Sequence, residues 1–261
     1  MTESGLYAYT IAPSDLRLDH ADIRNVPGID DRPLDLVTRH DLAVVVSPVD
    51  FAVLDVDEED LSDDGALARL ARRHDEVIRA VFEQAPVLPL RFGTLVRDHA
   101  AAAELIDDRH GQISAVLGRL RDRREWGVRL RRTGPAPSAD ARHESRSHAA
   151  TDARSGAAYL AQRSTALRAV DAARERERDL IEGLVADLEP YVDDSARRRA
   201  RQGGVLLLDM AYLVERSRED DFLDVAERLA TQAAPHGFDL ETTGPWPPYA
   251  FAHLAFTEAP A

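Results

Sequence analysis

Apolar residues in the first half of the chain follow first the short runs of strands and then the spacing of a helix. Residues 6–11 are rich in aromatic and β-branched side chains, which predicts a strand. Two further apolar runs, 34–37 and 42–46, flank a polar tripeptide and predict a hairpin. From residue 66 apolar positions recur every three or four residues, which predicts a helix that stops before Pro86. These positions are Leu67, Leu70, His74, Val77 and Val81.

A proline-containing strand and a second helix complete this half. Residues 87–93 predict a strand, and Pro89 places it at an edge or a bulge because proline has no amide hydrogen to donate. Asp98 is suited to cap a helix that runs to about residue 120 with one apolar side. We therefore expect residues 1–122 to form an α+β domain.

The second half alternates strands with helices. Residues 125–130 predict a strand, and the apolar positions between 155 and 189 predict a long helix with a polar middle. Residues 205–214 are long and apolar enough for a central strand buried on both faces. Further strands are predicted at 238–242 and 250–256. Between the strands at 205–214 and 238–242 lies a predicted helix whose inward positions are Phe222, Val225, Ala226 and Leu229.

This order is that of split β-α-β units, which pack their helices on one face of a sheet. A short extra strand near residues 191–195 would fit the same scheme. We therefore expect an α+β fold of two domains. The second, 123–261, is expected to be a modified ferredoxin-like fold with a long helix and a C-terminal tail strand.

One segment departs from this pattern. Residues 134–154 contain no valine, isoleucine, leucine or aromatic residue, so they cannot bury apolar surface to offset the entropy of ordering. We expect a disordered insertion in the second domain, and its deletion is expected to leave the melting temperature nearly unchanged.

Composition narrows the possible functions. The 261 residues include 47 acidic and 33 basic ones, a net charge of −14, and every basic residue is arginine. So acidic a chain repels phosphate backbones, which argues against nucleic-acid partners. Without cysteine there is no disulfide, thiolate metal ligand or thiol nucleophile, and without lysine no Schiff base. No apolar run approaches a membrane span and no signal-peptide pattern opens the chain, so we expect a soluble cytoplasmic protein.

Few residues suggest catalysis. His74 and Asp75 belong to the densest acid/base set, but His74 lies on the apolar stripe of its helix and is better explained as a core histidine. Acidic residues between 55 and 60 lack the spacing of a calcium loop. The arginines from 197 to 201 fit either a solvated turn or a site for an acidic partner. We predict no catalytic, cofactor or metal site.

Two segments are better suited to binding another protein. Arg91 lies inside an apolar strand, where we expect its charge to be buried in a pair, or else exposed to a partner. Three prolines stiffen the turn that carries Trp246 and Tyr249, and rigid aromatic side chains are good anchors, although these two could equally close the core. Arg91, Trp246 and Tyr249 are the candidate partner-binding residues. Replacing both aromatics is expected to weaken binding without unfolding the domain.

Six segments, in order along the chain, resemble those of the gas vesicle protein F/L family. They are Gly5–Tyr9, Pro86–Thr94, Glu125–Val128, Gly156–Leu160, Ala211–Val214 and Thr243–Phe251. The insertion at 134–154 is the clear departure. The resemblance does not distinguish an F-like from an L-like member.

The resemblance implies a non-enzymatic accessory or minor structural protein of gas vesicles, the gas-filled protein shells that give some prokaryotes buoyancy. Such a protein is expected to bind the small hydrophobic shell protein and other accessory proteins during assembly, in the cytoplasm and at the vesicle. No cofactor, nucleic acid or membrane is expected as a partner. The alternative is an enzyme on a ferredoxin-like scaffold, with a site built from His74, Asp75 and Arg91.

Overall fold

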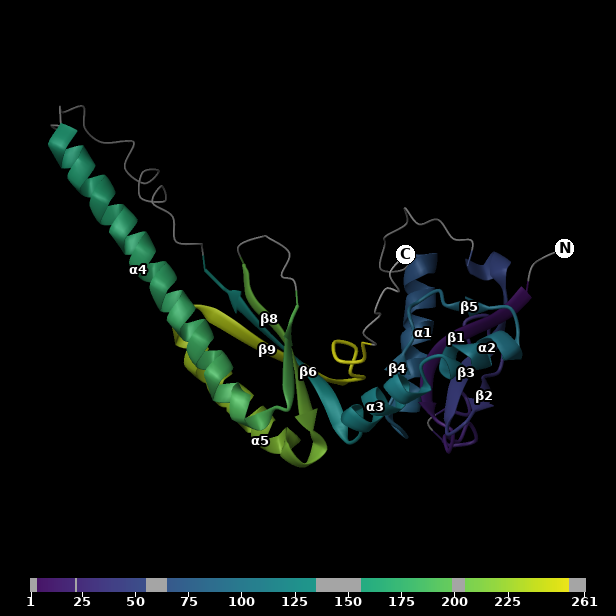
Figure 1. The fold of residues 1–261 in the computed structure, drawn as a ribbon. Coiled ribbons are helices and arrows are strands. Elements are labelled where there is room, and N and C mark those ends of the chain that lie inside the picture. Colours follow the sequence, from purple (N-terminus) through teal and green to yellow (C-terminus); the bar gives the residue numbers. More distant parts are fainter. Residues whose placement is uncertain (1–3, 22, 55–64, 135–155, 199–204, 254–261) are drawn as a thin grey trace. The chain divides into compact units, whose positions relative to one another are not determined.

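The computed structural model describes residues 4–21, 23–54, 65–134, 156–198 and 205–253 (Figure 1). The acidic loop, nearly all of the expected insertion, Arg199–Arg201 and the expected tail strand beyond residue 253 lie outside the described residues. The chain divides into two compact units, Met1–Glu125 with Gly244–Ala261, and Trp126–Thr243.

The first unit is built on a five-stranded sheet, in which four strands follow the order β2-β3-β1-β4 and the fifth, β5, also pairs with β1. Its strands are β1 (Ser4–Pro13), β2 (Asp35–Arg39), β3 (Leu42–Asp50), β4 (Leu88–Pro89) and β5 (Leu95–Val96). β1 and β3 run antiparallel from Ser4 opposite Asp50 to Pro13 opposite Leu42. The predicted hairpin of β2 and β3 is confirmed, and His40 in its turn has a φ of 57°.

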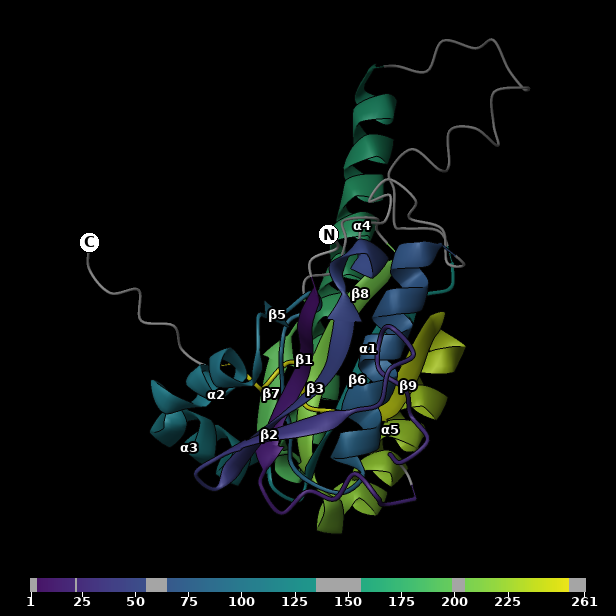
Figure 2. The ribbon, with the colours of Figure 1, turned by 90° about the vertical axis from the view of Figure 1, so that its right-hand side faces the viewer.

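Helices pack on both faces of this sheet (Figure 2). α1 (Ala66–Phe82) begins and ends as its apolar spacing predicts, and buries His74, Val77, Ile78, Ala80 and Val81. The helix predicted after Asp98 is two helices, α2 (His99–Asp107) and α3 (His110–Leu120), on the other side of the sheet. The Asp98 side chain does cap α2, accepting a 2.8 Å hydrogen bond from the Ala101 amide.

The strand predicted at residues 87–93 is mostly absent. Only Leu88 and Pro89 pair with β1, at the edge of the sheet as proline requires. The chain then turns, because the Thr94 amide donates to the Arg91 carbonyl (3.1 Å) and Gly93 has a φ of 83°. Glycine with positive φ at the third position of a four-residue turn is typical of type II turns, and it ends the extended segment here.

The second unit has a four-stranded sheet with the order β7-β8-β6-β9. Its elements, in chain order, are β6 (Arg123–Arg132), α4 (Gly156–Leu188), β7 (Asp194–Arg197), β8 (Leu206–Glu215), α5 (Glu219–Ala233) and β9 (Phe238–Trp246). β7 is the extra strand that the sequence allowed near 191–195, and it pairs antiparallel with β8. Short 3-10 helices lie at Glu189–Tyr191, Arg216–Arg218 and Ala234–His236 in this unit, and at Phe51–Leu54 in the first unit.

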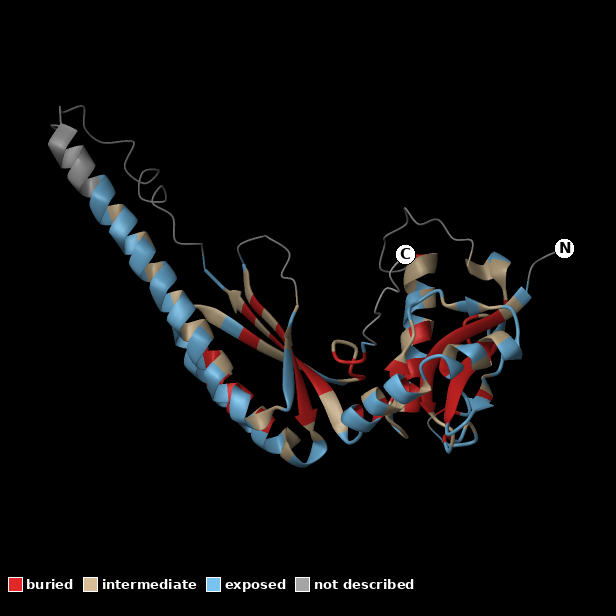
Figure 3. Cartoon of the chain, viewed as in Figure 1, coloured by how far each residue is buried: buried red, intermediate tan, exposed pale blue. Residues whose placement is uncertain are grey.

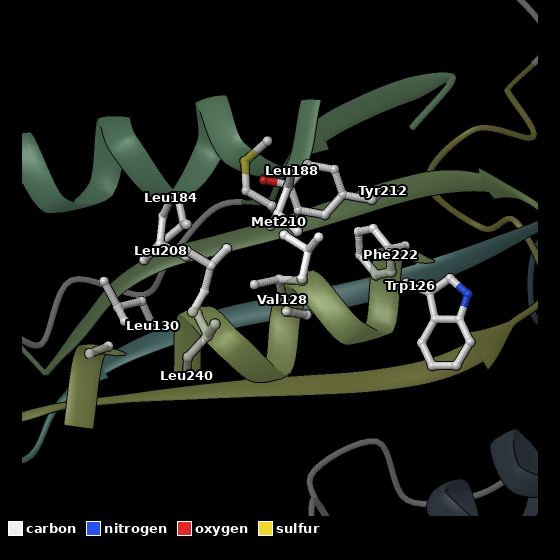
Figure 4. Close-up of a cluster of buried hydrophobic side chains, with 14 of the residues drawn as sticks. Trp126, Val128, Leu130, Leu184, Leu188, Leu208, Met210, Tyr212, Phe222 and Leu240 are labelled. Atoms are coloured by element: carbon white, nitrogen blue, oxygen red, sulfur yellow. The ribbon is translucent and has the colours of Figure 1, made fainter. Parts of the chain in front are cut away.

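The core of the second unit lies between this sheet and α4 and α5, which cover the same face (Figures 1 and 4). Trp126, Leu184, Met210 and Phe222 belong to it, and α5 buries the four residues predicted to face inward. The prediction that β8 is buried on both faces is confirmed over Met210–Val214, where every residue is buried. β8 is an interior strand, and next to this stretch its Asp209 approaches Arg129 of β6 at 3.6 Å.

Among the described side chains of α4, the fully buried ones lie in its C-terminal turns. Leu184 and Leu188 are its buried residues among those described, whereas Leu167 is 47% exposed (Figure 3). Its polar middle contributes an ion pair between Glu177 and Arg132 of β6. The N-terminal part of the described helix is thus solvent-exposed on most sides.

The C-terminal segment corrects two predictions. Residues 250–253 do not form a strand: Pro247 and Pro248 lack amide hydrogens for a ladder, and the Phe251 and Ala252 amides instead bond the Pro248 carbonyl (3.0 and 2.9 Å). This segment also belongs to the first unit, not to a domain that spans 123–261. The reason is its set of anchors on the first unit, such as Arg119 of α3, which donates to the Phe251 carbonyl at 2.7 Å.

Candidate functional site

The most distinctive polar network of the first unit supports the turn at residues 91–94. Tyr7 on β1 is fully buried, and its hydroxyl accepts a 2.8 Å hydrogen bond from the Gly93 amide. The same hydroxyl lies 3.1 Å from Nδ1 of His74 on α1. Burial raises the pKa of Tyr7 above its ordinary value of 10.0, because the phenolate would be desolvated. Tyr7 therefore stays neutral and joins β1, α1 and the turn.

His74 is a core histidine, as the apolar stripe of α1 predicts. It is 8% exposed, stacks on the Tyr9 ring and hydrogen-bonds the Leu90 backbone in addition to Tyr7. Burial lowers its pKa below 6.5, since the charged ring would lose its water. A neutral ring that both donates to the backbone and accepts from Tyr7 uses both of its nitrogens, which leaves none for acid/base work.

Arg91 is exposed at the start of the turn, so the expectation of a buried pair is wrong. Its backbone carbonyl accepts from the Thr94 hydroxyl (2.6 Å) and amide. Phe92 beside it is 41% exposed, with its ring centroid 5.7 Å from that of His74. Leu95, 38% exposed, lies opposite Tyr7 in the sheet. The structure thus places an exposed cation among exposed apolar side chains.

Tyr249 packs against the core of the first unit and bonds one residue of α1. Its hydroxyl donates to Asp75, and its ring contacts the core cluster that contains Tyr7, Tyr9 and Val77. Burial, and next the Asp75 carboxylate, raise the pKa of Tyr249 above 10.0. Of the two explanations left open for Tyr249, closing the core is the one that these contacts favour.

Trp246 is half-buried under the guanidinium of Arg79, which lies 4.1 Å above its ring. Arg79 also pairs with Asp75 one turn earlier on α1 (2.5 Å). The four side chains therefore form one chain of contacts, Trp246–Arg79–Asp75–Tyr249, that ties the C-terminal segment to α1. The Ala250 amide adds a 2.6 Å hydrogen bond to the buried Glu125 carboxylate.

The three residues of the alternative enzyme site have different partners. His74 hydrogen-bonds Tyr7 and the Leu90 backbone. Asp75 pairs with Arg79 and accepts a hydrogen bond from Tyr249. The Arg91 guanidinium has no hydrogen bond or ion pair within the described residues. Across the described ranges no group of three or more His, Asp or Glu residues is placed to hold a metal ion. Nor is any helix there long and apolar enough to cross a membrane.

Sequence reasoning missed Phe92 and Leu95 as surface residues and Tyr7 as the support of the turn. The predicted strand over 87–93 gave no reason to single out Phe92 as a surface residue. The available signal was Gly93, two residues after an arginine and followed by threonine, which is a composition suited to a turn.

The family described as "Gas vesicle synthesis protein GvpL/GvpF" matches residues 5–253. The chain belongs to this family. GvpL/GvpF membership covers both units and includes the turn at 91–94 and the C-terminal segment to His253.

Relatives within the GvpL/GvpF family carry both names. Gas vesicle protein L of Streptomyces sp. (strain CB03234) is 34% identical over 239 residues, covering 87% of this chain and 86% of its own. Gas vesicle protein F of the same strain is 28% identical over 182 residues, with coverages of 68% and 75%. Gas vesicle protein L1 of Halobacterium salinarum is 25% identical over 266 residues, with coverages of 95% and 90%.

Solved GvpF structures share the fold. The crystal structure of GvpF from Anabaena sp. PCC7120 has a TM-score of 0.67 at 18% identity and covers 97% of each chain. That of GvpF from Microcystis aeruginosa has a TM-score of 0.66, also at 18% identity, and covers 96% of this chain and 99% of its own. A mixed α/β chain with two antiparallel sheets is therefore the architecture of these GvpF proteins too.

Proposed function

We propose that this chain is a non-enzymatic accessory protein of gas vesicles that binds the small hydrophobic shell protein and other accessory proteins during vesicle assembly. The observation that carries the proposal is the GvpL/GvpF match over residues 5–253. The chain has a gas vesicle role by family, and the binding of particular partners is the step that we add.

The charge of the chain supports such a role. A small apolar shell subunit exposes surface that associates non-specifically until it is covered. A binder with a net charge of −14 keeps the resulting complex soluble by mutual repulsion, while a local apolar surface makes the contact. The first unit offers such a surface at Arg91, Phe92 and Leu95.

The three candidate partner-binding residues differ in how well they suit this role. Arg91 is exposed and lacks an ion pair among the described residues, which favours it. Trp246 is only half-buried, with the Arg79 guanidinium over its ring. Tyr249 is committed to Asp75, so truncating it is expected to loosen the C-terminal segment rather than to remove a contact with a partner.

We further assign the second unit to a ferredoxin-like arrangement. The order β6-α4-β7-β8-α5-β9 is two consecutive β-α-β units, and the sheet order β7-β8-β6-β9 inserts one unit's strands between those of the other. Both helices lie on one face of the sheet, as this arrangement requires.

A co-purification experiment tests the function. The tagged chain and the shell protein are produced together in the same cells, and the tagged chain is then purified. The amount of shell protein that co-purifies is compared with the amount captured by a tagged acidic protein of similar size. Selective capture of the shell protein, and loss of vesicles when the gene is deleted from a producing strain, are expected. If the deletion strain makes normal vesicles and no vesicle component is captured, the proposal is wrong.

A further inference from the structure

The turn between β4 and β5 gathers exposed apolar side chains that are otherwise rare on the described surface. Four large hydrophobic residues are exposed among those described, and two of them, Phe92 and Leu95, lie three positions apart here. Singly exposed apolar residues are ordinary on protein surfaces, whereas neighbouring ones are a feature of interaction sites. Phe92 packs against the Tyr7 ring and Leu95 lies opposite Tyr7 in the sheet, so both lie on the same side of β1, and Arg91 directly precedes Phe92.

The backbone of this turn is fixed before any partner arrives. The Leu90 amide donates to the Tyr9 carbonyl (2.9 Å), the Gly93 amide to the Tyr7 hydroxyl (2.8 Å), and the Ala8 amide to the Thr94 carbonyl (2.9 Å). Phe92 rests its ring edge-on against Tyr7 and His74. A surface held in this way loses little conformational entropy on binding, which favours affinity.

Arg91 sets the chemistry of the partner. Its guanidinium is exposed and has no ion pair or hydrogen bond within the described residues, in a chain where acidic residues outnumber basic ones by 47 to 33. An unpaired arginine in so acidic a protein is complementary to a carboxylate from outside. Phe92 and Leu95 are complementary to an apolar side chain.

We infer that Arg91, Phe92 and Leu95 form a docking surface for a protein segment that presents an apolar side chain next to an aspartate or glutamate. The inference rests on the proposed function, because it takes the segment to belong to another gas vesicle component. Phe92 and Leu95 exclude water from the contact, and Arg91 fixes its register by a charge-assisted hydrogen bond.

The test uses overlapping 15-residue peptides that cover the shell protein and the accessory proteins, probed with the full-length chain. Bound peptides are expected to contain an acidic residue within one helical turn of a large apolar one. Phe92→Ser is expected to weaken their binding by ~30-fold, the usual effect of losing an interface anchor. Arg91→Gln is expected to weaken it about tenfold at low salt, and the difference is expected to shrink at high salt.

Matched controls separate docking from folding. Leu167→Ser removes an equally exposed leucine from α4, and Arg228→Gln an exposed arginine from α5; both are expected to bind like the wild type. Phe92 touches the Tyr7 and His74 rings, so Phe92→Ser can also affect folding. The decisive variant is therefore Arg91→Gln, because the Arg91 guanidinium has no hydrogen bond or ion pair to lose within the described chain. Replacing the acidic residue of a bound peptide by its amide is expected to abolish the effect of Arg91→Gln.

The outcomes distinguish the two proposals. If the wild-type chain binds no peptide and captures no vesicle component, the proposed function fails. If it binds, and Arg91→Gln and Phe92→Ser bind as tightly as the wild type does, the docking surface is overturned while the function stands. Binding to peptides without acidic residues would overturn the assigned partner chemistry.

Discussion

At the scale of single residues, removing the hydroxyl group of two buried tyrosines is expected to change stability in different ways. The Tyr7 hydroxyl bonds the Gly93 amide and lies beside His74, whereas the Tyr212 hydroxyl on β8, equally buried, has no hydrogen-bond partner in the described chain. Burial raises the pKa of Tyr212 to about 12, so it too is neutral. Tyr7→Phe leaves polar groups unsatisfied and is expected to cost about 1–3 kcal/mol of stability. Tyr212→Phe is expected to be neutral or stabilising.

The two tryptophans make this comparison measurable. Trp126 belongs to the second unit and Trp246 to the first. In a Trp126→Phe background the remaining Trp246 reports on the first unit and hence on Tyr7→Phe. In a Trp246→Phe background the remaining Trp126 reports on the second unit and hence on Tyr212→Phe. Urea unfolding followed by tryptophan fluorescence gives each free energy of unfolding. Equal losses of unfolding free energy for both variants would show that the hydrogen-bonded hydroxyl of Tyr7 stabilises the protein no more than the unpaired hydroxyl of Tyr212 does.

Residue-scale prediction from sequence succeeds where one apolar pattern decides the environment. His74 was placed in the core from its spacing on α1, and α5 buries all four residues expected to face inward. It fails where a distant contact decides. Nothing near Tyr249 in the sequence reveals that its hydroxyl bonds Asp75, 174 positions away, nor that Arg79 covers Trp246. Arg91 was misplaced because the turn around it was not recognised.

At the scale of elements, α4 illustrates how packing rather than propensity stabilises a helix. Leu184 is 2% exposed in the core of the second unit, and Leu167, 17 positions earlier on the same helix, is 47% exposed. Leu184→Ala is expected to cost about 2–5 kcal/mol, and Leu167→Ala no more than about 0.5 kcal/mol. Urea unfolding in the Trp246→Phe background measures both. A large loss for Leu167→Ala would mean that the exposed part of α4 is covered by something.

Elements with a long, clear period were predicted well: β1, the β2–β3 hairpin, α1, α4, β8 and α5. The errors lie where proline and glycine compete with an apolar run. Pro89 and Gly93 cut the expected strand at 87–93 to two residues, and Pro247 and Pro248 turn the expected tail strand into a hydrogen-bonded turn. The order of strands in either sheet could not be derived, because it depends on pairings between distant segments.

At the scale of the whole molecule, the first unit is formed by two stretches that are not contiguous in the sequence. The chain leaves the first unit at Glu125, forms the second, and returns with residues 244–261. A boundary near residue 122 was expected from the composition and pattern, but the return was not, since it depends on the contacts of Trp246, Tyr249 and Phe251 with the first unit. The second unit is thus an insertion within the first.

Because the C-terminal segment packs on the first unit, its removal is expected to affect the first unit and not the second. A chain ending at residue 243 loses Trp246, Tyr249 and the Phe251 carbonyl as partners of Arg79, Asp75 and Arg119, and the buried Glu125 carboxylate loses the hydrogen bond from the Ala250 amide. We expect faster hydrogen exchange in peptides from α1 and α3, because the loss of these hydrogen bonds and an opened core edge lower the free energy of local opening. Peptides from β8 and α5 serve as the internal control and are expected to exchange as in the full chain, since the core cluster of the second unit ends at Leu240. Faster exchange in β8 and α5 with none in α1 would assign residues 244–253 to the second unit instead.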